Sequence, residues 1–231
     1  MVTKKGNEKA EERLEVVEEA LSKSEQFIEK NQKIITIVVA AIAVVVLGYF
    51  GLKRFYIEPR EADAQVQLFM AEKYFESDSL NKALYGDGNN LGFLDIISDY
   101  SMTKSANLSR YYAGICYLRQ GDFNEAIKQL KKFKSDDYII GSMALGALGD
   151  AHAELDQMDK AADFYMKAAN RNLNELTTPM FLFKAGRAFE ATSKYQKAVD
   201  AYESIRRQYP SSNEGRGIDK YIARAKSLSV R

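Results

Sequence analysis

The chain has 231 residues, of which 46% are hydrophobic and 28% are charged, a composition typical of one globular domain with an appendage. Its formal net charge of +1 gives no overall field that would attract nucleic acid or a membrane surface. A single cysteine, Cys116, excludes an internal disulfide, and we expect it to be a small buried side chain. A single histidine, His152, offers no metal cluster, so we expect no metal site and no cysteine–histidine catalytic pair.

Residues 1–33 are predicted to form an amphipathic helical tail. Leu14, Val17, Leu21 and Ile28 recur at spacings of three, four and seven, while glutamates fill many of the other positions. The apolar stripe is narrow. It could seat a partner helix, or the tail could be a solvated helix that leads into the next segment, and the residues leave both interpretations open.

Residues 34–52 are predicted to form a transmembrane helix, because the run IITIVVAAIAVVVLGYFGL carries no charge. A helix of this length spans about 28 Å, close to the thickness of the hydrocarbon layer of a bilayer. Lys33 precedes the run and Lys53 and Arg54 follow it. A buried core helix would show a polar edge, and a cleaved signal peptide would have a shorter basic lead and a small-residue cleavage site. We therefore expect an uncleaved single-pass anchor.

The basic residues do not decide the orientation of this anchor, because three lie near the run on each side. A short leader before a first span usually stays in the cytoplasm, and long C-terminal domains translocate largely regardless of charge. We expect the tail in the cytoplasm and the large domain outside it.

Residues 58–212 carry a repeated pattern in which a small residue is followed twelve positions later by alanine. The four pairs are Ala71 and Ala83, Gly114 and Ala126, Gly149 and Ala161, and Gly186 and Ala198. A ring lies three positions after each first member, at Tyr74, Tyr117, His152 and Phe189, and the last three copies carry Leu130, Tyr165 and Tyr202 four positions after the alanine. Small residues on two paired helices allow close approach, and we expect the larger side chains to fill the space around that contact.

One departure from the pattern and a C-terminal cap are predicted. The first two copies are 43 residues apart, whereas the others are 35 and 37 apart, so we expect an insertion at the loop-like sequence 85–90, with the second helix resuming near Phe93. Pro210 follows the last repeat as a helix stop. Residues 213–231 are predicted to form a capping helix, with Ile218, Tyr221 and Ile222 as its apolar face.

These spacings resemble the tetratricopeptide repeat (TPR), a helix–turn–helix unit of about 34 residues. The resemblance covers residues 60–210 and implies an all-α fold: an N-terminal transmembrane helix, a TPR-type solenoid of about four helix pairs, and a C-terminal capping helix. It also implies a protein-binding function, because the first helices of stacked pairs line a concave groove.

The groove residues are predicted from two positions in each repeat. One is the residue directly after the small first member of each pair, and the other is the residue three positions before that member. The predicted peptide-binding residues, with Phe75 added one turn after Glu72, are Leu68, Glu72, Phe75, Tyr111, Ile115, Gly146, Asp150, Phe183 and Arg187. Such a groove suits an extended or helical peptide. The alternative is that individual side chains merely pack between helices. Gly146 would leave a gap in the wall that Met143 could partly fill.

Enzymatic activity is not expected, and neither is a cofactor or a small-molecule substrate. The chain has no recognisable nucleophile–histidine motif, and the glycines of 85–90 lack the preceding strand and the lysine of a phosphate-binding loop. The chaperone-binding TPR class grips a carboxylate with lysine and asparagine, but Ile115 and Asp150 stand at two of those positions and only Arg187 is suitable. A carboxylate clamp is therefore not expected.

The order of tail, single span, repeats and cap is similar to that of the YfgM-like ancillary subunits of the bacterial Sec translocon, and parts of the sequence resemble TPR proteins of Bacteroidetes. This resemblance implies a bacterial inner-membrane protein with a periplasmic TPR domain. Such a protein would bind translocon subunits or a membrane-anchored chaperone and help to hand over translocated chains. The alternative is a structural scaffold of a cell-envelope complex, in division or secretion.

Overall fold

The computed structural model describes residues 29–230, and all regular secondary structure within that range is helical. The backbone divides into two compact units, one ending at Tyr56 and the other beginning at Ile57. Each unit is described separately below.

The first unit is a helix whose side chains are almost all exposed from residue 29 to residue 56. It belongs to a helical stretch, Glu29–Glu76, whose most apolar window has a mean hydropathy of 2.7 and is 0% buried. By length and composition this is a helix that could cross a membrane. The predicted tail, with Leu14, Val17 and Leu21, lies outside the described residues.

A short π-helical turn, η1 (Lys53–Ile57), follows the apolar run and precedes α2 (Glu58–Glu76). Pro59 stands at the start of α2. Proline has no backbone N–H to donate to the carbonyl four residues earlier, which accounts for the local change in helical hydrogen bonding.

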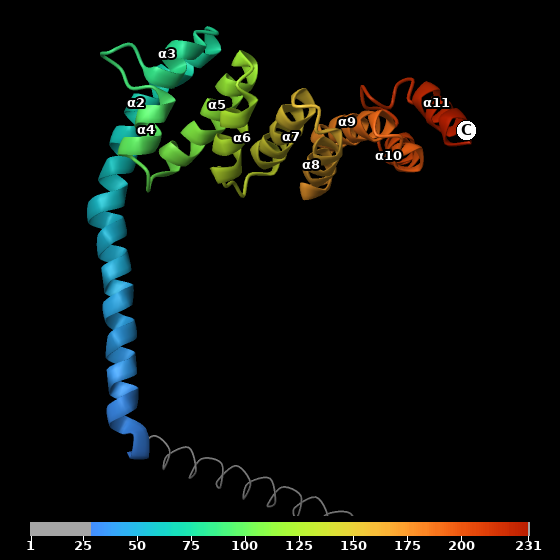
Figure 1. The fold of residues 1–231 in the computed structure, drawn as a ribbon. Coiled ribbons are helices and arrows are strands. Elements are labelled where there is room, and N and C mark those ends of the chain that lie inside the picture. Colours follow the sequence, from blue (N-terminus) through green and yellow to red (C-terminus); the bar gives the residue numbers. More distant parts are fainter. Residues whose placement is uncertain (1–28, 231) are drawn as a thin grey trace, which may run out of the picture. The chain divides into compact units, whose positions relative to one another are not determined.

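The second unit consists of ten α-helices within the described part of the chain. After α2 they are α3 (Leu80–Tyr85), α4 (Phe93–Asp99), α5 (Lys104–Gln120), α6 (Phe123–Lys132), α7 (Tyr138–Glu154), α8 (Met158–Arg171), α9 (Thr177–Ala191), α10 (Tyr195–Gln208) and α11 (Asp219–Ser229). Consecutive helices pack against each other as antiparallel pairs, α5 with α6, α7 with α8 and α9 with α10 (Figure 1). The first repeat pairs α2 with a second helix that is split into α3 and α4. The unit is an all-α, TPR-like solenoid.

The four predicted repeats share one hydrogen-bonding register. Each predicted ring residue accepts a backbone hydrogen bond from the residue five positions later: Tyr74 from Ser79 (2.8 Å), Tyr117 from Asp122 (2.9 Å), His152 from Gln157 (2.9 Å) and Phe189 from Lys194 (2.8 Å). The turn that this bond closes holds one left-handed residue in every copy, namely Asp78, Gly121, Asp156 and Ser193. The recurrence of one turn geometry is what a structural repeat requires.

The small first members of the pairs are contact points between the two helices of a repeat. A Cβ added to Gly114 would stand 2.5 Å from Leu130, one on Gly149 2.5 Å from Tyr165, and one on Gly186 2.3 Å from Tyr202. Each glycine is thus covered by the side chain four positions after the alanine of the same repeat. The alanines at 126, 161 and 198 are fully buried. The predicted small-residue seam is present in these three repeats.

The first repeat is interrupted where the sequence indicated. Residues 86–92 form a loop between α3 and α4, and Asp87 organises it. One carboxylate oxygen of Asp87 accepts the backbone N–H groups of Asn89 (3.0 Å) and Asn90 (2.7 Å), and the other accepts the Tyr74 hydroxyl at 2.7 Å. These hydrogen bonds hold the pKa of the Asp87 carboxyl well below its usual range. The second helix resumes at Phe93, which is fully buried.

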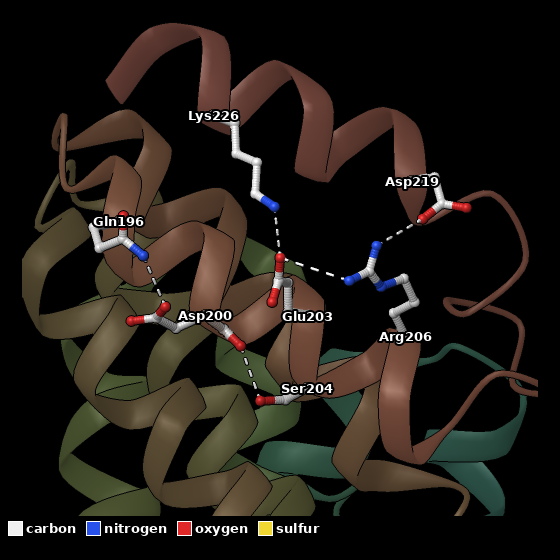
Figure 2. Close-up of polar contacts among 7 residues, drawn as sticks. All are labelled: Gln196, Asp200, Glu203, Ser204, Arg206, Asp219 and Lys226. Atoms are coloured by element: carbon white, nitrogen blue, oxygen red, sulfur yellow. Dashed lines mark hydrogen bonds and ion pairs between the residues drawn. The ribbon is translucent and has the colours of Figure 1, made fainter. Parts of the chain in front are cut away.

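Helix α11 covers the C-terminal end of the stack. It buries Ile222 and Ala225 in the same core cluster as Tyr202 and Ile205 of α10. Lys226 pairs with Glu203 at 2.7 Å, and Arg206 reaches both Glu203 and Asp219 at 3.7 Å (Figure 2).

The cap helix is shorter than the segment assigned to it. Residues 213–218 form turns and α11 begins only at Asp219. Gly217 has φ +82°, a left-handed conformation that a continuous helix does not contain.

Candidate protein-binding surface

The nine predicted groove residues lie on α2, α5, α7 and α9, the first helices of the four repeats. Two of them are interior. Leu68 is 6% exposed and belongs to the core around α2 and α4. Gly146 is buried, and a Cβ there would stand 1.9 Å from the ring of Phe181. The expected gap beside Gly146 is absent, because the Phe181 ring of α9 fills it.

The predicted residues of the first two repeats lie around an aromatic cluster whose rings meet mainly edge to face. Phe75 lies 5.2 Å from Tyr112, and Tyr111 lies 5.7 Å from Tyr112. Phe133, which follows the last residue of α6, lies 5.5 Å from Tyr111. Burial, followed by the charge of Glu72, raises the pKa of the Tyr112 hydroxyl to about 12. These half-buried rings pack between the helices of the first two repeats.

Arg119 closes this cluster on one side. Its guanidinium lies 4.5 Å from the centre of the Phe75 ring and 3.6 Å from the Asp78 carboxylate. Ile115, also predicted, is half-buried against Leu130 and Leu148 and contributes to the contact between the second and third repeats.

Asp150 is the centre of a polar contact between α7, α8 and α9. Its Oδ1 accepts the Tyr165 hydroxyl at 2.6 Å, and its two oxygens accept Lys184 Nζ at 2.7 and 2.9 Å. Burial and this carboxylate together raise the pKa of the Tyr165 hydroxyl. The carboxylate of Asp150 is therefore already paired with a cation, and Lys184 lies over the Tyr165 ring at 5.6 Å.

Two open pockets adjoin at this contact. One, of about 330 Å³, lies between α7, α8 and α9 and is lined by Ala153, Met158, Tyr165, Phe183, Lys184, Arg187, Ala188 and Ala191. The other, of about 530 Å³, reaches across to α5 and is lined by Leu118, Arg119, Gly121, Phe123, Asp150, Ala153, Glu154, Tyr165 and Lys184. Both include Ala153, Tyr165 and Lys184, so they form one depression, which we call the α5–α9 groove.

The groove combines an apolar floor with an exposed cation. Three of the predicted residues, Asp150, Phe183 and Arg187, line it. Phe183 also packs edge to face on Tyr221 of α11 at 4.8 Å, so one side of its ring is fixed by the cap. Arg187 is exposed, and it makes no ion pair with any residue between 29 and 230.

Lys184 and Met158 were missed by the sequence reasoning, which sampled only two register positions in each first helix. Lys184 stands two residues before Gly186, and its partner Asp150 stands one residue after Gly149, the equivalent glycine of the preceding repeat. The opposite charges at those two positions of adjacent repeats could have predicted this ion pair from the sequence.

Cys116 and His152 lie in the interior. Cys116 is fully buried, and burial raises the pKa of its thiol to about 12, so it is a neutral thiol at physiological pH. His152 is 5% exposed and stacks on Phe164 with its ring centre 5.2 Å away. Both side chains are part of the packing, as expected for Cys116.

Comparisons with known proteins agree with this arrangement. The tetratricopeptide repeat family matches residues 108–137 and 181–212, which correspond to the second and fourth repeats. A TPR repeat-containing protein of Methanocaldococcus jannaschii is 28% identical over 149 residues, which are 62% of this chain and 22% of the relative. The chain thus spans about a fifth of the length of that relative.

Two solved structures have a similar fold. Both are crystal structures of nearly identical TPR-like repeats from Podosopora anserina, and one of them carries a single substitution. The substituted form aligns with a TM-score of 0.55 and the other with 0.54, each at 15% identity over 74% of this chain and 88% of the other chain. The shared turn register, the close glycine contacts and these matches lead to one conclusion: the second unit is built from tetratricopeptide-type repeats, and such repeats imply protein–protein interaction.

Proposed function

We propose that the protein is a membrane-anchored adaptor that binds an extended segment of a partner protein in the α5–α9 groove. The observation that carries this proposal is Arg187, an exposed cation at the rim of a pocket whose other lining residues include Met158, Phe183 and Ala188. A cation beside an apolar pocket recognises an apolar side chain that is followed by an acidic group.

The charges around the groove support this ligand chemistry. Asp150 and Glu154 are the acids of the groove lining, and Asp150 is already bonded to Lys184. Arg119 is similarly engaged, by Asp78 and the Phe75 ring. Arg187 is thus the cation best placed to meet a ligand carboxylate.

The proposed location is the bacterial inner membrane, with residues 34–52 as the single span, the tail in the cytoplasm and the TPR unit in the periplasm. The apolar, unburied helix within Glu29–Glu76 supports an anchor. A reporter fused after Arg231 that is active only outside the cytoplasm tests the orientation. Activity of a cytoplasm-specific reporter at the same position would overturn it.

The more specific proposal is an ancillary subunit of the Sec translocon that helps to transfer emerging chains to periplasmic chaperones. Its support is the resemblance in layout to the YfgM-like subunits. The test is a pull-down of the full chain from detergent-solubilised membranes. Recovery of translocon subunits or of a membrane-anchored chaperone is expected. Recovery of neither would overturn this role, but it would not decide whether the groove binds a peptide.

A structural scaffold of a cell-envelope complex is a second candidate, and one observation favours it. Val66 and Phe69 are exposed on α2, the first helix of the stack, where no preceding repeat covers them. A scaffold would use such a surface, or the tail stripe of Leu14, Val17 and Leu21, to join subunits. Polar substitutions in the stripe would then abolish assembly, whereas an adaptor would lose partner binding through changes in the groove.

A further inference from the structure

Apart from Val66 and Phe69 of α2, Tyr85 at the end of α3 and Val230 after α11, the large exposed hydrophobic side chains of the second unit lie on the connections that lead from one repeat to the next. Met102 is 58% exposed between α4 and α5, and Tyr138 (68%) and Ile139 (49%) are exposed where α7 begins. Leu173 (66%) and Leu176 (67%) are exposed between α8 and α9. Within residues 57–230, the turns inside repeats, at 77–79, 121–122, 155–157 and 192–194, carry no large hydrophobic side chain that is exposed to this degree.

These connections form one continuous edge that starts where the chain enters the unit. The Glu61 carboxylate, in the first turn of α2, accepts hydrogen bonds from the backbone N–H of Lys104 (2.5 Å) and the hydroxyl of Ser105 (2.7 Å) at the start of α5. The first turn of α2 therefore lies beside the connection that carries Met102.

The edge continues through two further contacts. Asn107, in α5, donates to the carbonyl of Lys134 at 2.7 Å and accepts the backbone N–H of the same residue at 3.0 Å. Arg171, the last residue of α8, donates to the carbonyl of Ser135. In Figure 1 the α4–α5 and α6–α7 connections and the end of α8 lie on one side of the stack, opposite the α5–α6 and α7–α8 turns. We call this side the entry edge.

Chain connectivity keeps the first turn of α2, where the entry edge starts, close to the end of the apolar run. Only Lys53–Ile57 separates Leu52, the last residue of the run, from Glu58, the first residue of α2. Five residues cover at most about 18 Å even when fully extended. In any orientation of the second unit, the first turn of α2 therefore stays near the end of the run.

We propose that the entry edge lies on the bilayer surface, with Met102, Tyr138, Ile139, Leu173 and Leu176 inserted among the lipid headgroups. This inference rests on the proposed membrane anchoring. Tyrosine and aliphatic side chains gain free energy in the interfacial layer, where their apolar parts leave water. Two exposed lysines at the same edge, Lys104 and Lys134, would meet lipid phosphates. Asp136, Asp137 and Glu175 are exposed there too, so the apolar tips and not a net charge carry the contact.

The chain contains no tryptophan, so single tryptophans report on this edge without background. The full chain is reconstituted in nanodiscs whose scaffold protein also lacks tryptophan, in phosphatidylcholine with brominated acyl chains. Tryptophan emission is compared with that in unbrominated lipid, and each sample is also measured with added iodide. Leu173→Trp and Tyr138→Trp test the entry edge. Asn124→Trp, in the exposed first turn of α6 at the opposite edge, is the matched control, and Leu47→Trp reports on the span itself.

The expected result is a loss of emission in brominated lipid for Leu173→Trp, Tyr138→Trp and Leu47→Trp, with the first two protected from iodide. Asn124→Trp should be quenched by iodide and not by lipid. If Leu47→Trp is quenched by lipid while both edge variants respond only to iodide, the entry-edge proposal is overturned and the anchor stands. If Leu47→Trp is not quenched by lipid, the anchoring itself is wrong.

A protein partner on the same edge would give a different pattern. The edge tryptophans would be open to iodide in pure-lipid nanodiscs, and Leu173→Cys, in a chain whose Cys116 is buried, would react with a labelled maleimide in those nanodiscs but not in native membrane vesicles. That outcome would also overturn contact with lipid. Far-ultraviolet circular dichroism of each variant checks that the helices are retained.

Discussion

The ring of Tyr165 lies directly on Gly149, so that a Cβ on this glycine would stand 2.5 Å from Cε1 and 2.6 Å from Cδ1 of the tyrosine. The ring cannot swing away easily, because its hydroxyl is bonded to Asp150 at 2.6 Å. The contact between the two helices of the third repeat therefore depends on the missing side chain.

We predict that Gly149→Ala destabilises the second unit. Alanine improves helix propensity by about 1 kcal/mol, but overpacking in a tight core costs about 1–3 kcal/mol. The expected net effect is a loss of about 1 kcal/mol, measured as a shift in the urea unfolding midpoint in detergent. Asn170→Ala, at an exposed position of α8, is the control and should be neutral or slightly stabilising. A gain in stability for Gly149→Ala would contradict the close contact between Gly149 and Tyr165.

Glu61 joins the first repeat to the second by capping α5 from another helix. Replacing a capping side chain costs roughly 1 kcal/mol, and Glu61 accepts hydrogen bonds from both Lys104 and Ser105. We predict that Glu61→Ala lowers the free energy of unfolding by about 1–2 kcal/mol. Amide hydrogen exchange should rise at the start of α5. Asp63→Ala, at an exposed position of α2, should change neither quantity.

His152 makes stability depend on pH. Burial lowers its pKa below the ordinary value of 6.5, although a hydrogen bond from the ring to Gln157 at 3.0 Å acts in the opposite direction. As the pH falls, His152 is protonated in the unfolded chain before it is protonated in the folded chain. The contribution of the neutral, buried His152 to stability is therefore fully present above pH 6.5 and is lost as the pH falls through the lowered pKa of the folded state. Unfolding at a series of pH values measures this loss. It should shrink in His152→Phe, since the chain has no other histidine.

Arg187 should determine the preference of the groove for acidic ligands. A hydrogen bond to a charged group contributes about 1.5–3 kcal/mol, so Arg187→Glu should weaken binding of a peptide in which leucine is followed by glutamate at least about tenfold. Fluorescence anisotropy of the labelled peptide measures this change. Arg207→Glu, at an exposed position of α10, matches the change in charge outside the groove. Equal losses in both variants would indicate a general charge effect and not a site.

The cap should be held mainly by its apolar face. Ile222 is 4% exposed within the cluster that includes Tyr202. Truncating a buried isoleucine to alanine costs about 2–5 kcal/mol. We therefore predict that Ile222→Ala lowers stability clearly, whereas Lys226→Ala, which removes an exposed ion pair with Glu203, has little effect. Thermal unfolding of the two variants compares the two contributions.

The repeat register could be predicted from the sequence because its physical causes recur at fixed spacing. Close helix contacts need small residues, and the turn needs the same backbone geometry each time, so Gly114, Gly149 and Gly186 mark equivalent positions. The loop at 85–90 was recognised from its glycines and asparagines, which helices disfavour.

The contacts between repeats could not be predicted in this way. Glu61 reaches Ser105 across 44 positions, Asn107 reaches Lys134 across 27, and Arg171 reaches Ser135 across 36. These separations share no period, and each contact uses different side chains. The groove was predicted only in part for the same reason: the filling of Gly146 by Phe181 and the pairing of Lys184 with Asp150 depend on how one repeat lies on the next.

The two ends of the stack are unlike. At one end α11 covers the last apolar surface, and its own outward positions include exposed Lys220, Ala223 and Lys226. At the other end Val66 and Phe69 of α2 remain exposed. Head-to-tail growth into a filament needs an end that accepts and an end that inserts. The polar outer side of α11 does not match the apolar side of α2, whereas α2 meeting α2 of a second copy would form a closed twofold pair.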